Sequence, residues 1–295
     1  MILAAIDIGS NAARLLICDA TPYEKGAVDY TKLTLLRIPL RLGFEVFEKG
    51  NISSEKARQL IDSMKAYKLL MGIYKVEGYR ACATSAMRDA KNGQQIIKDV
   101  YAETGIQIEI IAGQEEANII YETHIAENLN PGKSYLYIDV GGGSTEVTLF
   151  ADNKIVFKES FNIGTIRLLN KSVTDEQWNH MKWHIKTHTA GYQPLVAIGS
   201  GGNINKIFSL SKKKEGKPLS LELLKDYCRE LSASTVAERM HLYNFRADRA
   251  DVIVPALEIF IAIMRWSNAS EIYVPRIGLA DGLIKMQYAE KVKLN

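Results

Sequence analysis

Residues 138–146 read I-D-V-G-G-G-S-T-E, and the apolar run that leads into them from Tyr135 predicts a buried strand. The strand carries a carboxylate, Asp139, next to its last residue, Val140, and three glycines follow. Glycine lets the backbone adopt positive φ and lets a ligand approach backbone N–H groups closely. A simple hairpin turn does not need three glycines, whose ordering costs backbone entropy. A carboxylate beside free N–H groups suits a phosphate with a divalent cation, because the N–H groups bind the anion and the acid binds the metal.

Two further segments carry glycine turns of the same kind. I-D-I-G-S-N at residues 6–11 also joins an apolar run, an aspartate, a glycine turn and a second apolar run. Asp7 and Asp139 lie 139 − 7 = 132 positions apart, close to half of 295 residues. This duplication predicts two similar domains that face each other across a phosphate cleft, although the segment at Asp7 alone fits a plain hairpin equally well. G-S-G-G-N at residues 199–203 marks a strand-to-helix junction, where helix N–H groups point outward.

Composition sets limits on the class of protein. The hydrophobic content of 47% and charged content of 24% are those of a soluble globular protein, and a net charge of +3 gives no reason to expect nucleic acid as a partner. The three cysteines are far apart in apolar segments and are predicted to be reduced core residues. We expect no membrane span and no secretion signal, and therefore a cytoplasmic protein.

The first half of the chain predicts a ribonuclease H-like unit, which is α/β with a partly antiparallel sheet. Residues 42–51, with Gly43 and Gly50, are predicted to be a loop, and Ser53 is predicted to cap the helix that follows. The predicted strands are 2–8, 13–19, 33–38, 79–84 and 106–111, and the predicted helices begin near residues 54, 94 and 114.

The second half predicts a similar unit after a linker at 128–134. We therefore expect domains at 1–127 and 128–295, with the final helix, about 279–295, as a candidate to pack back on the first domain. The predicted strands are 135–140, 145–150, 154–161, 195–198 and 271–274, and the predicted helices begin near residues 164, 174, 203, 220, 234, 249 and 279.

Two histidines, His180 and His184, have the i, i+4 spacing of a pair of metal ligands on a helix. Because the pair lacks an apparent third ligand nearby, the two histidines are predicted to lie on a plain helix surface. The lysine run at 212–217 is predicted to be an exposed, solvated loop.

Eight segments together carry a resemblance that spans essentially the whole chain. The chain resembles the exopolyphosphatase / guanosine pentaphosphate phosphohydrolase family, in the short form without a C-terminal helical domain. The segments are D-I-G-S-N at 7–11, A-T-S-A-M-R-D-A-K-N-G at 83–93, I-A-G-Q-E-E-A at 111–117, I-D-V-G-G-G-S-T-E at 138–146, I-G-T-I-R-L at 163–168, G-S-G-G-N at 199–203, R-A-D-V-I-V-P at 249–255 and G-L-A-D-G-L at 278–283.

The resemblance implies a fold, a reaction and a set of site residues. The fold is two ribonuclease H-like domains of the sugar kinase–actin–heat-shock chaperone superfamily, facing each other across a cleft. The reaction is Mg²⁺-dependent hydrolysis of a terminal phosphoanhydride, with Glu116 as the base that activates water. Glu146 is a second acid near the nucleophile, and Arg88 neutralises charge. Metal binding is assigned to Asp139 and Asp7. Phosphate binding is assigned to Gly9, Ser10, Asn11, Gly141, Gly142, Gly143, Ser144, Gly201 and Gly202.

The sequence departs from the family at Ala12, Ser200, Asn203 and Ala280, which changes contacts to the second or third phosphate. The predicted function is release of terminal phosphate from inorganic polyphosphate, with short or medium chains preferred, by a homodimer. One alternative is a guanosine pentaphosphate 5′-phosphohydrolase. Two others are a kinase-like enzyme of the same superfamily and a non-catalytic polyphosphate or nucleotide sensor. Without the resemblance, Glu115 and Glu116 would be only an acidic helix start, and Glu115 is assigned that role.

Overall fold

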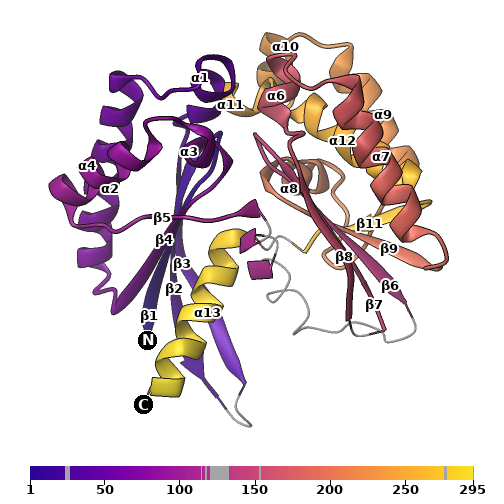
Figure 1. Ribbon diagram of the computed structural model, residues 1–295. Coiled ribbons are helices and arrows are strands. Elements are labelled where there is room, and N and C mark those ends of the chain that lie inside the picture. Colours follow the sequence, from indigo (N-terminus) through magenta and orange to yellow (C-terminus); the bar gives the residue numbers. More distant parts are fainter. Residues whose placement is uncertain are drawn as a thin grey trace. The chain divides into compact units, whose positions relative to one another are not determined.

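The computed structural model of the chain describes residues 1–23, 27–113, 115–116, 118–119, 133–152, 154–275 and 278–294 (Figure 1). The chain divides into two compact units, Met1–Thr123 with Gly278–Asn295, and His124–Ile277. The predicted domain boundary at 127 and 128, and most of the predicted linker, lie outside the described residues.

The described residues of the first unit form a five-stranded sheet in the order β3-β2-β1-β4-β5. The first three strands are antiparallel, and β4 and β5 join parallel to β1 and to each other. The strands are β1 (Ile2–Ile8), β2 (Ala13–Pro22), β3 (Val28–Ile38), β4 (Gly78–Ala83) and β5 (Glu109–Ile110).

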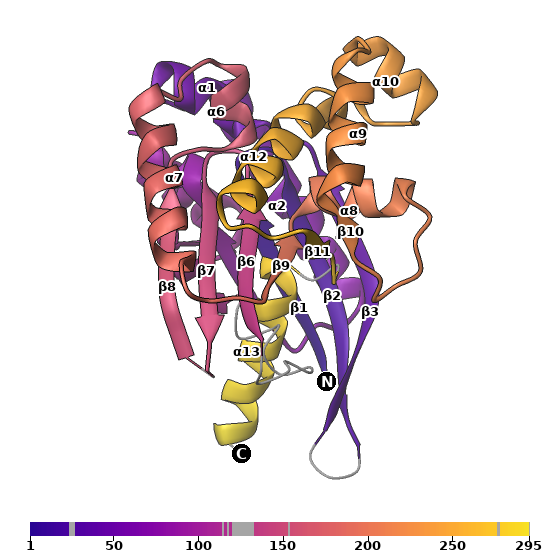
Figure 2. The same ribbon diagram turned by 90° about the vertical axis from the view of Figure 1, so that its right-hand side faces the viewer.

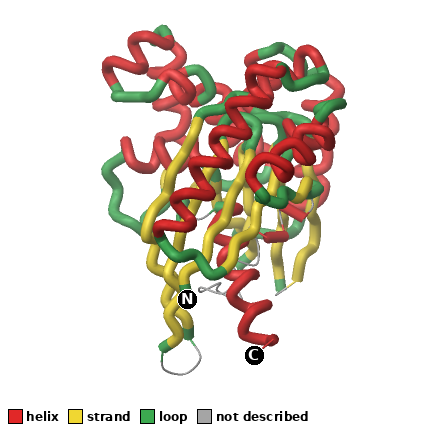
Figure 3. Tube along the Cα trace, turned by 90° about the vertical axis from the view of Figure 1, so that its left-hand side faces the viewer, coloured by secondary structure: helices red, strands yellow, loops and turns green. Residues whose placement is uncertain are grey.

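Alternate residues of β1 pack in two separate cores, because successive side chains of a strand point to opposite faces. Ala4, Ile6 and Ile8 pack with α1, α2, α3 and α4, whereas Leu3 and Ala5 pack with α13. Figure 1 shows α2 and α4 on one side of the sheet and α13 on the other, and α2 crosses the strands in Figure 3. The helices are α1 (Leu42–Lys49), α2 (Ser54–Ile73), α3 (Ser85–Asp89), α4 (Gly93–Thr104) and α13 (Leu279–Leu294).

Three predictions for the first unit were wrong in part. Residues 42–49 form α1 rather than a loop, since Gly43 is buried in the helix and Gly50 ends it in the left-handed conformation that glycine adopts readily. β3 begins at Val28, not at residue 33, because the hairpin with β2 is longer than the apolar pattern. Of the strand predicted at 106–111, only Glu109–Ile110 pairs with β4. The predicted helix after Ser53 is confirmed, with the Ser53 side chain accepting from the Lys56 N–H group.

The described residues of the second unit form a six-stranded sheet in the order β10-β11-β9-β6-β7-β8. Figure 2 shows its strands side by side, from β8 at one edge to β10 at the other. Strands β8, β7, β6, β9 and β11 have the same order and directions as β3, β2, β1, β4 and β5. The strands are β6 (Ser134–Val140), β7 (Thr145–Ala151), β8 (Lys154–Phe161), β9 (Leu195–Ser200), β10 (Leu219–Ser220) and β11 (Glu271–Tyr273). The predicted duplicated α/β fold with partly antiparallel sheets is confirmed.

A single large core joins this sheet to its helices, with α12 packed against α6, α7, α8 and α9. The predicted cap of α7 is confirmed, because Thr174 and Gln177 form a reciprocal capping box. The helices are α6 (Thr165–Leu169), α7 (Asp175–Thr189), α8 (Gly202–Leu210), α9 (Leu221–Ser232), α10 (Val236–Leu242), α11 (Ala247–Ala250) and α12 (Ile253–Trp266). Among the described helices, none has the length and apolar character that crossing a membrane requires.

Candidate active site

A row of four polar side chains crosses the sheet of the second unit. Asp139 on β6 pairs with Glu146 on β7 and with Ser200 on β9, and Glu146 pairs in turn with Ser160 on β8. Residues paired in register share one face of a sheet, and directly opposite Cβ atoms lie about 4.5–5.5 Å apart. The Ser160 hydroxyl donates to Glu146 Oε1 at 2.8 Å. Like charges opposite each other are destabilising, so the Asp139–Glu146 pair favours a bound cation.

The glycine turn after β6 is tied to α6 by its carbonyl groups. The N–H groups of Thr165 and Ile166 donate to the carbonyl oxygens of Gly141 and Gly142 at 3.0 and 2.8 Å. The Arg167 Nε donates to the carbonyl oxygen of Gly143 at 2.7 Å. In a planar trans peptide the N–H group points opposite to the carbonyl of the preceding residue. The N–H groups of residues 142, 143 and 144 therefore point away from α6, and successive N–H groups on one side form an anion-binding concavity.

This arrangement depends on Gly164, which sequence reasoning did not single out. A Cβ atom at residue 164 would lie 2.5 Å from the Gly142 carbonyl oxygen, a separation that real Cβ atoms do not show. The turn itself is closed by a hydrogen bond from the Gly141 N–H to the Ser144 carbonyl at 2.9 Å. The glycine between a strand and a short helix in I-G-T-I-R was the only sequence signal for this contact.

The third glycine turn lies beside Asp139. Gly201 has φ +102°, and a Cβ atom there would lie 2.9 Å from Asp139 Oδ1. Gly202 begins α8, so its N–H group belongs to the first turn of a helix. Among the described residues, the buried Ser200 Oγ has no hydrogen-bond partner. An unpartnered buried hydroxyl costs free energy, and a ligand at this position would supply the missing partner.

The equivalent row of the first unit has a different charge. Asp7 pairs with Cys82 on β4 and with Arg14 on β2, and Arg14 pairs with Arg37 on β3. Arg14 forms an ion pair with Asp7 through Oδ2, and Asp7 is buried. The first unit therefore presents an aspartate with two arginines where the second presents two carboxylates with two serines.

The turn after β1 is also fixed by its carbonyl groups. The Ser10 and Asn11 carbonyl oxygens accept from the N–H groups of Gly43 and Arg41, both at 2.9 Å. The same planarity argument directs the N–H groups of residues 11 and 12 away from the start of α1. The Gly9 N–H donates to the Ala12 carbonyl, which closes the turn. The Ser10 hydroxyl is buried against Ser85 Oγ at 2.8 Å, a partner that the sequence did not reveal.

Arg88 and Glu116 belong to segments that contact each other in the first unit. Arg88 on α3 donates through an Nη to the Ile111 carbonyl at 3.1 Å. The Glu116 N–H donates to the Ala112 carbonyl at 2.9 Å, and its side chain is half-buried. Glu115 is exposed and lies 3.6 Å from the Arg80 guanidinium. The two adjacent glutamates therefore have different surroundings, and Glu115 has a structural partner on β4.

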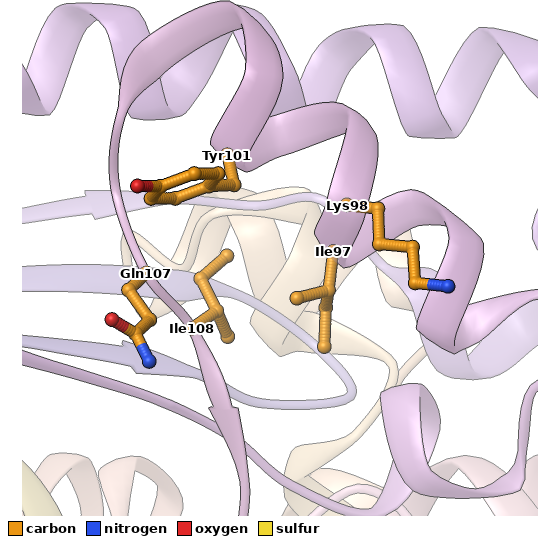
Figure 4. Close-up of a pocket in the computed structure, with 5 residues that line it drawn as sticks. All are labelled: Ile97, Lys98, Tyr101, Gln107 and Ile108. Carbon is orange, nitrogen blue, oxygen red and sulfur yellow. The ribbon is translucent and has the colours of Figure 1, made fainter.

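One shallow pocket in the first unit lies away from these residues (Figure 4). It has a volume of about 390 Å³ between α4 and the segment before β5. Its lining is apolar apart from Lys98, Gln107 and the Tyr101 hydroxyl, and it contains no carboxylate or glycine turn. We assign no chemistry to it.

Two ribonuclease H-like sheets, each with a glycine turn after its first strand, define a duplicated α/β protein. The model of the Ppx/GppA phosphatase family matches residues 23–290. The chain belongs to the Ppx/GppA phosphatase family, as its motifs indicated.

Three similar proteins illustrate the range of this family. The "Bifunctional 3-dehydroquinate synthase/phosphatase" of Fusobacterium nucleatum is 33% identical over 171 residues, which cover 57% of this chain and 26% of that protein. "Exopolyphosphatase 1" of Mycobacterium tuberculosis is 25% identical over 308 residues, which cover 96% of this chain and 87% of that protein. The crystal structure of the Aquifex aeolicus Ppx/GppA family member is 25% identical with a TM-score of 0.76, and the match covers 99% of this chain and 98% of that one.

Proposed function

We propose that this chain is a Mg²⁺-dependent hydrolase that releases the terminal phosphate of inorganic polyphosphate. The observation that carries the proposal is the glycine turn 141–144. The carbonyl groups of residues 141–143 are bonded to α6, so the N–H groups of residues 142–144 point the other way. Such a turn fits the oxygens of a terminal phosphate. Gly141, Gly142, Gly143 and Ser144 are the proposed phosphate-binding residues.

The polar row beside this turn fits a hard cation. Mg²⁺ prefers oxygen ligands, and Asp139 and Glu146 supply carboxylate oxygens flanked by the hydroxyls of Ser200 and Ser160. Asp139 is the proposed metal ligand, and bound Mg²⁺ would neutralise charge on the transferred phosphate. Asp7 is proposed as a second ligand through Oδ1, since Arg14 holds its other oxygen.

Glu116 is the proposed general base. Phosphoryl transfer to water depends mostly on positioning and electrostatics, and a carboxylate that orients and deprotonates the water contributes about 10²–10⁴-fold. Glu146, whose Oε1 is held by Ser160, is the proposed second acid. Arg88 is proposed to neutralise charge on the substrate.

The other glycine turns are proposed to bind the following phosphates. Gly9, Ser10 and Asn11 are the proposed phosphate-binding residues of the first unit, and the contact is made through the backbone, because the Ser10 hydroxyl is already bonded to Ser85 and the Gly9 N–H to the Ala12 carbonyl. The Asn11 N–H group, which points away from the start of α1, is the proposed donor. Gly201 and Gly202 contribute through the backbone at the start of α8. These contacts are to phosphate oxygens and do not depend on what the phosphate chain carries.

The choice of substrate depends on groups beyond the terminal phosphate. The lysine run 212–217 is exposed, as its polarity predicted, and cationic side chains of this kind suit an extended anion. Lys213 is also exposed, but its Nζ is already engaged, because it donates to the Pro218 carbonyl at 2.7 Å. Polyphosphate of short or medium length is therefore the proposed first substrate. Guanosine pentaphosphate is the alternative, because it ends in the same phosphoanhydride.

The proposal is tested by phosphate release from short polyphosphate, long polyphosphate and guanosine pentaphosphate at one ionic strength, with and without Mg²⁺. We expect Mg²⁺-dependent release, and the highest kcat/KM for short polyphosphate. A clear preference for the nucleotide would establish the alternative, and a steep rise with chain length would contradict the proposed length preference. Binding of polyphosphate without any release would indicate a sensor. The expected homodimer and cytoplasmic location stay predictions.

A further inference from the structure

Three potential metal ligands meet on the second unit at a place that the proposed reaction does not use. His180 and His184 lie one turn apart on α7, and Glu159 lies on β8. Ligand atoms of all three residues lie within 4.8 Å of one another. His184 Nδ1 is 2.7 Å from Glu159 Oε2, and His180 Nε2 is 4.0 Å from Glu159 Oε1. The expectation that the histidine pair lacks a nearby third ligand was therefore wrong.

The fold fixes the position of Glu159 under α7. Phe157 and Phe161 on β8 belong to the core between the sheet and its helices, and Glu159 lies between them on the same face of the strand. The Phe161 ring packs edge-on against the rings of His180 and His184, at centroid distances of 5.9 and 6.1 Å. These aromatic contacts hold both imidazoles next to the carboxylate.

His184 has a buried ligand atom without a hydrogen bond. Among the described residues, no atom forms a well-aligned hydrogen bond with His184 Nδ1, although Glu159 Oε2 is close to it. The contact is therefore a close approach without the alignment of an N–H donor.

The chemistry of the three ligands selects the kind of ion. Two imidazoles and one carboxylate form the protein ligand set of many zinc sites, whereas Mg²⁺ is bound mainly by oxygen. With metal–ligand bonds of about 2.0–2.1 Å, tetrahedral geometry places ligand atoms roughly 3.3 Å apart. The two measured separations, 2.7 and 4.0 Å, lie on either side of this value. Small rotations of the two imidazoles would bring both separations to this value.

Space for a fourth ligand is present. A pocket of about 410 Å³ is lined by Glu159, His180 and residues 160–163, with Glu176 and Gln177 of the first turn of α7. Water can therefore complete the coordination of a bound ion, as it does in zinc sites with three protein ligands.

We propose that Glu159, His180 and His184 form a binding site for a divalent transition-metal ion of the zinc type. The site is separate from the row that contains Asp139 and Glu146, because Glu159 and Ser160 are successive residues of β8 and point to opposite faces of the sheet.

The test uses the full chain after removal of metals with EDTA, in a buffer that contains excess Mg²⁺. Zn²⁺ is titrated by calorimetry, and Co²⁺ is added separately to record its visible absorption. We expect one Zn²⁺ per chain and the absorption of tetrahedral Co²⁺. His184→Ala and Glu159→Gln should weaken Zn²⁺ binding by more than the roughly 10–100-fold that loss of an outer-shell partner costs.

His188→Ala is the matched control, since His188 lies one turn further along α7 and stacks on Phe157 at 4.3 Å. It should leave Zn²⁺ binding unchanged. His180→Ala changes a side chain that is 56% exposed, so it separates loss of a ligand from loss of folding. The proposal is overturned if the wild type shows no Zn²⁺ binding in Mg²⁺, if His180→Ala binds as tightly as the wild type, or if Asp139→Asn removes the binding.

Discussion

Asp139 on β6 lies directly opposite Glu146 on β7, at the register that Asp7 and Arg14 occupy in the first unit. Both pairs are seven residues apart and follow the same kind of glycine turn. The aspartate of the first unit is neutralised within the protein, whereas that of the second unit faces another acid. Duplication has therefore given one scaffold two electrostatic characters, and the acidic copy suits a metal ion.

Replacement of Glu116 by Gln should remove turnover and leave polyphosphate binding nearly intact, because the proposed base acts on water and not on the substrate. Rates of phosphate release and equilibrium binding measure the two effects separately. Glu115→Gln is the matched control, since Glu115 is exposed near Arg80, and it should keep most of the activity. A Glu116→Gln rate above about a tenth of wild type would contradict the assignment, as a base is worth about 10²-fold or more.

The Asp139→Asn variant should need more Mg²⁺ for half-maximal activity, because an amide is a poorer ligand than a carboxylate for a hard cation. Activity is measured across a Mg²⁺ titration. Asp152→Asn serves as the control, since Asp152 is exposed with φ +50°, a conformation that Asn tolerates. An identical Mg²⁺ midpoint for Asp139→Asn and wild type would rule out a metal-binding role for Asp139.

Gly164→Ala should reduce kcat and stability together, because the new Cβ atom would displace the Gly142 carbonyl and with it the proposed phosphate turn. Gly72→Ala is the control. Gly72 lies in the last turn of α2 with no atom within 4 Å of an added Cβ, so this change should leave the kinetics unchanged and should not lower stability. Thermal unfolding and steady-state kinetics check both. Unchanged kinetics in Gly164→Ala would show that the turn does not need its close contact with α6.

Cys18 and Cys82 should resist alkylation by iodoacetamide at pH 8 in the folded protein. Burial raises the pKa of Cys18 to about 11 and that of Cys82 to about 12, and both side chains are nearly inaccessible. The thiolate is the reactive form, so a raised pKa and burial act in the same direction. Mass spectrometry should find label on the half-buried Cys228 first and on all three cysteines after unfolding. Rapid labelling of Cys82 in the native state would contradict the packing of β4.

The same shifts predict a loss of stability at alkaline pH. The folded-state pKa of each thiol lies above its unfolded value of about 8.5. The contribution to stability is therefore complete below about pH 8.5 and is lost as the pH rises towards the folded value. Urea unfolding between pH 8 and 10 should show this decline, and Cys82→Ala should make it shallower. An equal slope in that variant would assign the decline to other groups.

Local pattern was enough to predict the ends of β1 and β6, because each strand is an apolar run broken by an aspartate and a glycine turn. Local pattern could not predict the partners of Ser160 and Glu159, since these depend on the register of β8 against β7 and on the packing of α7. The helix at 42–49 was missed because its two glycines suggested a loop, whereas Gly43 is buried in the helix and Gly50 ends it. In each of these cases the structure depends on strand pairing or packing between residues that are far apart in the sequence.

Helix α13 has a consequence for how the protein is made. It covers the face of β1 that carries Leu3 and Ala5, so residues near the two ends of the sequence share one core. The ribosome releases the chain from its N-terminus, and domains usually fold as they emerge. Here the hydrophobic face of the sheet that Leu283 and Ile284 cover in the folded protein stays open until α13 has been synthesised. The unit that is translated first is thus the last to be completed, while the contiguous unit His124–Ile277 can close before it.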